Sequence, residues 1–510
     1  MSSRYAIANR ERPNHLSDHT SNRVTILNAS LLRPAIYIAA LCGLYLATAM
    51  FLPAMMDLYY GHDDWQVFAL SAFMVGGISL MTALATRGAP PVFTKRLGFL
   101  LVNLLWVIFS LVGAIPLYLA DHDLSFAQSI FESISAITTT GSTVLVGLDD
   151  LPPGILLWRS LLQWLGGIGI VALGLFVLPF LRVGGMSFFK LESSDTSDKP
   201  FARLASFTRA FIGIYVGITL VCAICYAWAG MNRFDALNHA LTTVATGGFS
   251  THDASFGYFN SIPLLWISTV FMTICSLPFS LLIIFVVRRR LDSLRDPQII
   301  VFVGYLFVFS VALGVYHHLN NDVGLGTALA HSFHNISSIL STTGYASTDY
   351  TAWGPFAVAL AFFATFMGGC TGSTAGGIKA YRFVVLFNIV GTGLKRLVYP
   401  NAVYSVRYGK AVIEPEAQRG IFLFVALYIF LWAVGSLAMT LLGYDFLTSA
   451  SSVITALSNV GPGIGDIVGP AGNFSTISDP ALYLLSVMML AGRLEILTVL
   501  VLLTPLFWRQ

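Results

Sequence analysis

The sequence predicts an all-α integral membrane protein with about ten transmembrane helices, and three observations carry this prediction. Of the 510 residues, 56% are hydrophobic and only 10% are charged, whereas soluble proteins carry about 25% charged residues. The mean hydropathy is +0.76, and many apolar runs reach the length of about 20 residues that a helix needs to cross a bilayer. Finally, one pattern of long and short apolar runs occurs four times along the chain, which indicates an internal repeat.

The first part of the chain is predicted as a polar tail and a two-helix extension. Residues 1–23 are polar and lack a short hydrophobic segment with a cleavage site, so we expect residues 1–33 to form a retained cytoplasmic tail rather than a signal peptide. Apolar runs at 34–52 and 67–85 then form an extension over residues 34–97. All five cysteines lie in or beside apolar runs, so we expect no disulfides. The net charge of +3 gives no indication of a nucleic-acid partner.

Four pseudo-symmetric repeats follow, and we expect them to surround one central pore. Each contains a long apolar run, a shorter amphipathic run that ends in a Thr/Gly segment, a polar stretch and a second long apolar run. The repeats occupy residues 98–190, 191–296, 297–417 and 418–510. Their short runs are 126–140, 234–246, 328–343 and 446–460. Their second long runs are 155–181, 262–287, 355–390 and 481–507, and each is expected to cross the membrane.

The distribution of charge predicts the orientation. Arginines and lysines concentrate in the N-terminal tail and in the loops at 87–96, 182–209, 288–295 and 379–419. The opposite loops are mainly acidic and hold only Arg159 and Arg233 as basic residues. Basic loops stay on the cytoplasmic side, so we expect both termini in the cytoplasm and all four Thr/Gly segments toward the outside.

The short runs are predicted as re-entrant helices that carry a cation filter. Runs of about 14 residues are too short to cross a bilayer, and non-helical backbone at membrane depth must be buried in protein or line water. Uncharged threonine hydroxyls and free carbonyls, with glycine allowing unusual backbone angles, suit a dehydrated cation. Helix C-termini directed at the same point add partial negative charge. The predicted filter residues are Thr139, Thr140, Gly141, Ala245, Thr246, Gly247, Thr342, Thr343, Gly344, Asn459, Val460 and Gly461.

Polar residues behind the short runs are predicted to support the filter. Glu132, Asn238, Asn335 and Ser452 each stand nine residues before a filter glycine, and we expect them to brace the filter backbone. His331 and His334 are three residues apart on the third short run, where either a metal pair or polar support fits the spacing. We favour support, because no H-E-x-x-H motif accompanies them.

A glycine-rich stretch interrupts the second long run of the third repeat. MGGCTGSTAGGIK is no phosphate-binding loop, since Ile378 separates Gly377 from Lys379, which Ala380 follows. Because glycine is a poor helix former, we expect this stretch to leave the helix and to act as an intramembrane gate. The predicted gate residues are Gly368, Gly369, Gly372, Gly376, Gly377, Lys379 and Arg493.

Arg493 and Glu495 lie near the middle of the last apolar run. An arginine at the bilayer centre costs at least about 2.5–3.5 kcal/mol, so it needs a role. Either Arg493 faces a water-filled path below the filter and reaches carbonyls of the gating loop, or it forms an ion pair with Glu495 or with an acid on another helix.

These features closely resemble the Trk/Ktr/HKT superfamily of potassium transporters, in particular the TrkH/TrkG type of bacterial uptake subunit. The wording that carries the resemblance is RSLLQWLGGIGI (159–170), MGGCTGSTAGGIKAYR (367–382) and AGRLEILT (491–498). The two extra N-terminal spans match the Trk branch, and STTGYA (341–346) is similar to the TVGYG filter loop of potassium channels.

The resemblance implies a potassium-selective translocating subunit in the bacterial inner membrane, with K⁺ as substrate and Rb⁺ as a second candidate ion. It further implies a homodimer with one pore per protomer, embedded in the lipid bilayer, and a cytoplasmic ring of TrkA-type nucleotide-binding subunits. The resemblance links a serine at the first filter glycine to sodium permeation, so Gly141 favours potassium. A sodium-permeable or H⁺/Na⁺-coupled symporter of the same fold remains the alternative. We expect neither enzymatic activity nor an organic cofactor, because the spans hold little titratable chemistry.

Overall fold

The protein is almost entirely helical. The computed structural model describes residues 16–88, 94–120, 122–174, 200–289 and 295–508. Within these residues, seven helices are long and apolar enough to cross a membrane, and nine if each of two bent helix pairs counts as one span. The only described strands are the two-residue pair β1 (Arg407–Tyr408) and β2 (Ala411–Val412). The predicted all-α membrane fold is therefore confirmed.

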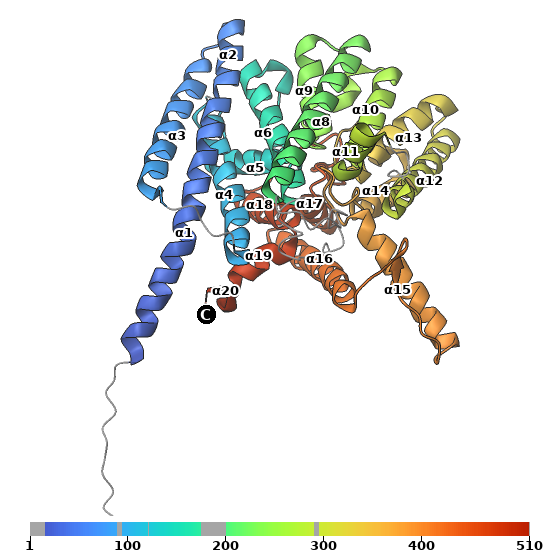
Figure 1. The fold of residues 1–510 in the computed structure, drawn as a ribbon. Helices are drawn as coiled ribbons and strands as arrows, with labels where there is room; N and C mark the ends of the chain where they lie inside the picture. The colour runs from blue at the N-terminus through green and yellow to red at the C-terminus, as the bar shows by residue number, and fades with distance from the viewer. Residues whose placement is uncertain (1–15, 89–93, 121, 175–199, 290–294, 509–510) are drawn as a thin grey trace, which may run out of the picture.

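The N-terminal extension consists of α1 (Leu16–Ala49), α2 (Phe51–Tyr60) and α3 (Trp65–Thr86), and α3 packs along α1 (Figure 1). The first apolar stretch runs on to Tyr60 because Pro53 falls in the first turn of α2, where proline is tolerated. Asp57 on α2 is buried and accepts a hydrogen bond from the Gly154 N–H at 2.5 Å. Since that N–H lies in the unpaired first turn of a helix, the contact joins the extension to the first repeat.

The four repeats follow one another with the same order of elements. Their first helices are α4 (Lys95–Leu119), α8 (Pro200–Trp228), α12 (Pro297–Asn320) and α16 (Pro415–Leu441). Their short helices are α5 (Phe126–Ile137), α9 (Arg233–Val244), α13 (Leu325–Leu340) and α17 (Phe446–Ser458). Their second helices begin with α6 (Pro153–Ala172), α10 (Ile262–Cys275), α14 (Pro355–Thr365) and α18 (Asp479–Arg493). Short 3₁₀ turns η1 (Leu148–Asp150), η4 (Ser255–Phe259) and η6 (Tyr350–Trp353) precede the first three of these.

Polar caps fix where most of the short helices begin. The Ser125 side chain accepts a hydrogen bond from the Gln128 N–H, and the Gln128 side chain accepts one from the Ser125 N–H, which is a capping box. The side chains of Asn232 and Asp445 also cap α9 and α17, by accepting a backbone N–H bond from the first turn of each helix. The short helices contain 12 to 16 residues, so at 1.5 Å per residue they fall short of the hydrocarbon thickness of about 30 Å.

Two of the predicted second spans are broken, which corrects the expectation of single helices at 262–287 and 481–507. α10 is followed by α11 (Phe279–Arg288) after a bend of 99°, at a break where Pro278 removes a helical hydrogen-bond donor. α18 is followed by α19 (Ile496–Leu503) after a bend of 110°, with Glu495 at a φ of 61° between them. α20 (Pro505–Trp508) ends the described chain.

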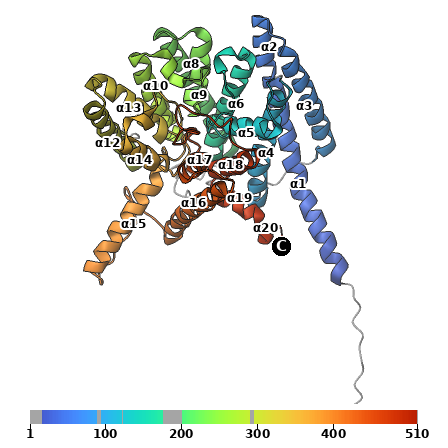
Figure 2. The ribbon, with the colours of Figure 1, turned by 180° about the vertical axis from the view of Figure 1, so that it is seen from behind.

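The third repeat is interrupted as predicted. α14 ends at Thr365 and α15 (Ala380–Val398) begins after the glycine-rich loop. α15 then projects from the body of the protein on the side where α1 begins and α20 ends (Figures 1 and 2). The two ends of the described chain thus lie on one side of the molecule.

Arg159 is not in a loop, contrary to the expectation from the charge distribution. It lies inside α6 with its side chain 1% exposed. Of the basic loops used for the orientation, parts of 87–96, 182–209 and 288–295, and the start of the N-terminal tail, fall outside the described residues.

Candidate ion-conducting site

Each short helix ends in a segment of the same unusual backbone shape. One residue adopts a left-handed φ of 51–57°, and two residues later a glycine has a positive φ as well. The first residues are Thr139, Thr246, Thr342 and Asn459, and the glycines are Gly141, Gly248, Gly344 and Gly461. Left-handed threonine is uncommon, and such strained residues concentrate at functional sites. Four recurrences in matching places identify these segments as the candidate site.

This shared shape corrects the register predicted for the second repeat. The Thr140 N–H donates to the Ser135 carbonyl at 2.8 Å, and in α9 the Gly247 N–H donates to the Thr242 carbonyl at the same distance. Gly247 therefore occupies the place of Thr140, and the equivalent of Gly141 is Gly248. The predicted triplet Ala245, Thr246, Gly247 moves one residue to Thr246, Gly247, Gly248.

The four segments contact one another in a closed ring. A Cβ built on Gly141 would overlap the Gly247 carbonyl oxygen, and one on Gly248 would overlap that of Thr343. A Cβ on Gly344 would likewise overlap the Val460 oxygen, and one on Gly461 would come within 2.8 Å of the Thr140 oxygen. Each segment thus meets the next, and the fourth meets the first. Only glycine allows backbones to approach so closely.

The ring brings together carbonyl oxygens from equivalent positions. These are the oxygens of Thr140, Gly247, Thr343 and Val460. The C-termini of α5, α9, α13 and α17 end at the same place, and each carries a partial negative charge. Uncharged oxygens with this electrostatic bias are suited to replacing the hydration shell of a cation.

Side-chain hydrogen bonds join neighbouring segments of the ring. Asn459 Nδ2 donates to Thr140 Oγ1 at 2.9 Å, and Ser142 Oγ donates to the Gly461 carbonyl at 2.8 Å. Both bonds link the fourth segment to the first. The Tyr345 hydroxyl and Thr242 Oγ1, 2.5 Å apart, link the third segment to α9.

The predicted supporting residues divide into two groups. Glu132 accepts hydrogen bonds from the Val144 N–H at 2.9 Å and from Thr143 Oγ1 at 3.0 Å. Asn335 accepts from the Ser347 N–H at 3.0 Å. Both therefore hold the chain just beyond a Thr/Gly segment.

The other two supporting residues do not behave as predicted. Asn238 Nδ2 donates to the Phe234 carbonyl and Ser452 Oγ to the Ser449 carbonyl, which are groups of their own helices. The bracing expected of these two side chains is wrong for this structure.

The two histidines of α13 have separate polar partners. His331 Nδ1 lies 2.8 Å from Ser347 Oγ, and His334 Nδ1 lies 2.7 Å from Ser268 Oγ. No group of three or more metal-binding side chains occurs in the described part of the chain. Their contacts agree with polar support behind the segments.

The glycine-rich loop is held by many backbone hydrogen bonds rather than loosely unwound. It lies in the break between α10 and α11, where the Cys370 N–H donates to the Ser276 carbonyl and the Phe279 N–H to the Gly372 carbonyl, each at 2.9 Å. This break was not predicted from the sequence, although Pro278 within an apolar run was a usable signal. The broken helix supplies free backbone groups that pair with the loop.

The loop directly contacts the candidate site. The Gly376 N–H donates to Thr342 Oγ1 at 2.5 Å. A Cβ built on Gly376 would overlap the Ser458 carbonyl oxygen at the end of α17. The loop thus lies against the cytoplasm-facing ends of the third and fourth segments in the predicted orientation.

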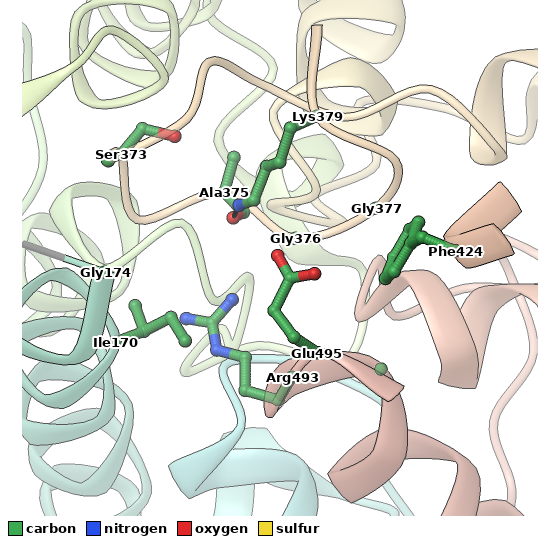
Figure 3. Close-up of a pocket in the computed structure, with 12 residues that line it drawn as sticks. Ile170, Gly174, Ser373, Ala375, Gly376, Gly377, Lys379, Phe424, Arg493 and Glu495 are labelled. Carbon is green, nitrogen blue, oxygen red and sulfur yellow. Dashed lines mark hydrogen bonds between the residues drawn. The ribbon is translucent and has the colours of Figure 1, made fainter. Parts of the chain in front are cut away.

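Four charged side chains lie close to the loop, and Figure 3 shows three of them around one cavity. Arg382 Nη2 donates to Glu495 at 2.5 Å, and the Arg382 guanidinium lies 3.6 Å from the centre of the Phe424 ring. No ion pair between Arg493 and Glu495 is formed among the described residues. The pairing of Arg382 with Glu495 was not predicted from the sequence, although Arg382 falls in the quoted motif.

Arg493 and Lys379 both line the cavity, but their hydrogen bonding differs. Lys379 Nζ donates to the Ala375 carbonyl of the loop. The three guanidinium nitrogens of Arg493 are buried and have no hydrogen-bond partner among the described residues. The expected hydrogen bonds of Arg493 to loop carbonyls are absent from the part of the chain that the structure describes, but Arg493 and the loop line the same cavity (Figure 3).

A histidine between two carboxylates lies in the loop that follows the second segment. His252 Nε2 is 3.0 Å from Asp235 Oδ2, Nδ1 bonds to Asp149, and the ring stacks on Tyr258. Burial alone would lower the pKa of His252, but its hydrogen bonds to Asp235 and Asp149 outweigh this effect and raise the pKa above the ordinary value of 6.5.

The raised pKa predicts a pH-dependent stability. A group whose pKa is higher in the folded state stabilises the fold fully below its unfolded pKa of about 6.5, and this contribution is lost as the pH rises through the folded pKa. We therefore expect the melting temperature in detergent to fall as the pH rises above about 6.5. In His252→Gln the same melting curves should show a weaker fall, and an equal fall in both proteins would contradict the assignment.

Four re-entrant segments around one axis, carried by paired long helices, define a helical membrane protein of the cation-transporting class. Residues 71–508 match the model of the family described as TrkH, cation transport protein. The chain belongs to this family.

Named relatives agree with the family over almost the whole chain. The chain is 43% identical to the Trk system potassium uptake protein TrkI of Halomonas elongata, covering 94% of this chain and 97% of the relative. It is 36% identical to TrkH of Escherichia coli K12, covering 93% and 98%. The crystal structure of the potassium transporter TrkH from Vibrio parahaemolyticus superposes with a TM-score of 0.87 at 34% identity, covering 94% of this chain and 100% of that one.

Proposed function

We propose that this chain is the potassium-selective ion-translocating subunit of a Trk-type potassium uptake system in the bacterial inner membrane. The observation that carries the proposal is the closed ring of four Thr/Gly segments, in which glycines at 141, 248, 344 and 461 each contact a neighbouring carbonyl. Relatives named as potassium uptake proteins support potassium as the substrate. The four pore repeats are assigned to residues 98–190, 191–296, 297–417 and 418–510, after the tail at 1–33 and the extension at 34–97.

The filter and the gate are separate parts of this proposal. The filter consists of the corrected triplets, which differ from the predicted set only by Gly248 in place of Ala245. The gate consists of the loop at 368–379, which includes Lys379, together with Arg493. Contact between Gly376 and Thr342 supports a gate placed directly against the filter.

The proposed assembly is a homodimer with a TrkA-type nucleotide-binding ring on the cytoplasmic side. Both termini are then cytoplasmic, and the two ends of the described chain, at α1 and α20, lie on a common side in Figures 1 and 2. α15 projects on that side and ends in exposed Lys395 and Arg396. It joins the loop at Ala380, so a partner bound to α15 has a short covalent route to the gate.

Ion flux into proteoliposomes tests the proposed function. We expect K⁺ and Rb⁺ to enter faster than Na⁺, without an imposed proton or sodium gradient, and a TrkA-type subunit to change the rate. Liposomes without protein give the background. A requirement for either gradient would favour the H⁺/Na⁺-coupled symporter, and equal K⁺ and Na⁺ flux would favour the sodium-permeable alternative.

A further inference from the structure

The second segment lacks a side chain where the other three segments have one. Gly247 occupies the position of Thr140, Thr343 and Val460. Its φ is not in the left-handed region, unlike that of Gly248, so the backbone conformation alone does not require glycine there. Another cause must explain why this position is a glycine.

Gln163 of α6 occupies the space that a side chain of residue 247 would need. A Cβ built on Gly247 would overlap the Gln163 amide. Gln163 Nε2 donates to the Gly247 carbonyl at 2.6 Å, and Gln163 Oε1 accepts from the Phe249 N–H at 3.1 Å. The side chain is completely buried. One amide from the first repeat thus binds the second segment on both sides of Gly248.

Close packing of α6 against the ends of α5 and α9 holds this amide in place. A Cβ on Gly166 would overlap the Ile137 carbonyl at the end of α5, and one on Gly167 would lie 3.1 Å from Ala245 Cβ at the end of α9. The helix is therefore wedged between the ends of two short helices, and Gln163 reaches the second segment from a fixed position.

Arg159, four residues before Gln163, lies on the same face of α6. Its Nε donates to Glu132 at 2.8 Å, and its Nη1 donates to the Ser250 carbonyl at 3.3 Å. Arg159 therefore joins the first repeat to the second just beyond Phe249. Arg159 and Gln163 together connect α6 of the first repeat to the second repeat at two points.

We propose that Gln163 is a positioning residue for ion selectivity, which fixes the Gly247 carbonyl at the junction of the first and second segments. The inference rests on the proposed function, because it takes the ring as the potassium filter. One neutral hydrogen bond contributes about 0.5–1.5 kcal/mol, and tenfold corresponds to about 1.4 kcal/mol. Loss of the amide is therefore expected to lower the K⁺/Na⁺ permeability ratio about two- to twelvefold.

Permeability ratios from reversal potentials test this role in the full-length protein. Gln163→Glu keeps the shape and the acceptor for Phe249, but its carboxylate cannot donate to Gly247. We expect both Gln163→Glu and Gln163→Ala to lower the ratio. Ser160→Ala is the matched control, because within the described residues this buried hydroxyl on α6 bonds only to the Leu156 carbonyl of its own helix, and it should keep the wild-type ratio.

A double-mutant cycle separates positioning from a general loss of structure. Gly247→Ala should lower the ratio by displacing the amide, whereas Gln163→Ala creates room for the new Cβ. The combined variant should therefore be no worse than either single variant. Additive losses, or a wild-type ratio in Gln163→Glu, would overturn the inference. If Gln163→Ala does not fold, the shape-preserving Gln163→Glu decides alone. A wild-type protein without potassium preference would instead overturn the proposed function.

Discussion

Gly141→Ser is expected to lower the K⁺/Na⁺ permeability ratio about tenfold or more. Gly141 has a φ of 85°, and its Cα faces the Gly247 carbonyl so closely that any Cβ would overlap the oxygen. A left-handed serine costs about 1–2 kcal/mol by itself, and the overlap forces the first and second segments apart. A wider ring no longer matches the size of K⁺, so it discriminates less between K⁺ and Na⁺.

Gly61→Ser is the matched control for backbone strain. Gly61, at the end of α2, also has a positive φ, 78°, but no atom of the described residues lies within 4 Å of a Cβ built there. It should keep the wild-type permeability ratio in the same reversal-potential measurement. If Gly141→Ser keeps that ratio too, the ring of glycines is not the filter.

Arg493→Ala is expected to raise basal flux at least tenfold while leaving the permeability ratio unchanged. The guanidinium of Arg493 is buried beside the cavity under the loop, without a hydrogen-bond partner among the described residues. The positive charge of Arg493 and a passing cation about 4 Å away repel each other by about 4 kcal/mol at an effective dielectric constant of about 20. Even a third of this energy changes the rate of ion passage about tenfold. Glu495 keeps Arg382 as its partner, so the substitution leaves no acid unpaired.

Two further variants complete the test of the gate. Arg493→Lys keeps the charge and should keep low basal flux. Shortening the loop at 368–379 should raise basal flux and weaken the response to a TrkA-type subunit. Wild-type flux and wild-type regulation in both Arg493→Ala and the shortened loop would mean that the loop is only a structural element.

The sequence was sufficient for the fold class and for the place of the four Thr/Gly segments, because length and hydropathy constrain a chain in a bilayer strongly. It was insufficient for the register of the second segment. Gly247 and Gly248 are chemically identical, and only the end of α9 decides which one matches Gly141. The spacing of the repeats varies with loop length and could not make this choice.

The helix breaks were missed for a different reason. Hydropathy reports that residues can lie in a membrane, but not whether their helix is continuous. At the break near Pro278, the Ser276 backbone pairs with the glycine-rich loop. The two segments are far apart in the sequence, so hydropathy does not reveal their pairing. Arg159 was misplaced similarly, because its buried partner Glu132 comes from another helix.

Anomalous X-ray diffraction from crystals soaked in Rb⁺ shows whether the ring of Thr/Gly segments binds the ion. We expect an anomalous peak on the axis of the ring, within coordination distance of the carbonyl oxygens of Thr140, Gly247, Thr343 and Val460. The same peak should weaken when K⁺ competes and should persist when Na⁺ replaces K⁺ as competitor. Ordered Rb⁺ elsewhere in the protein with none inside the ring would contradict the account.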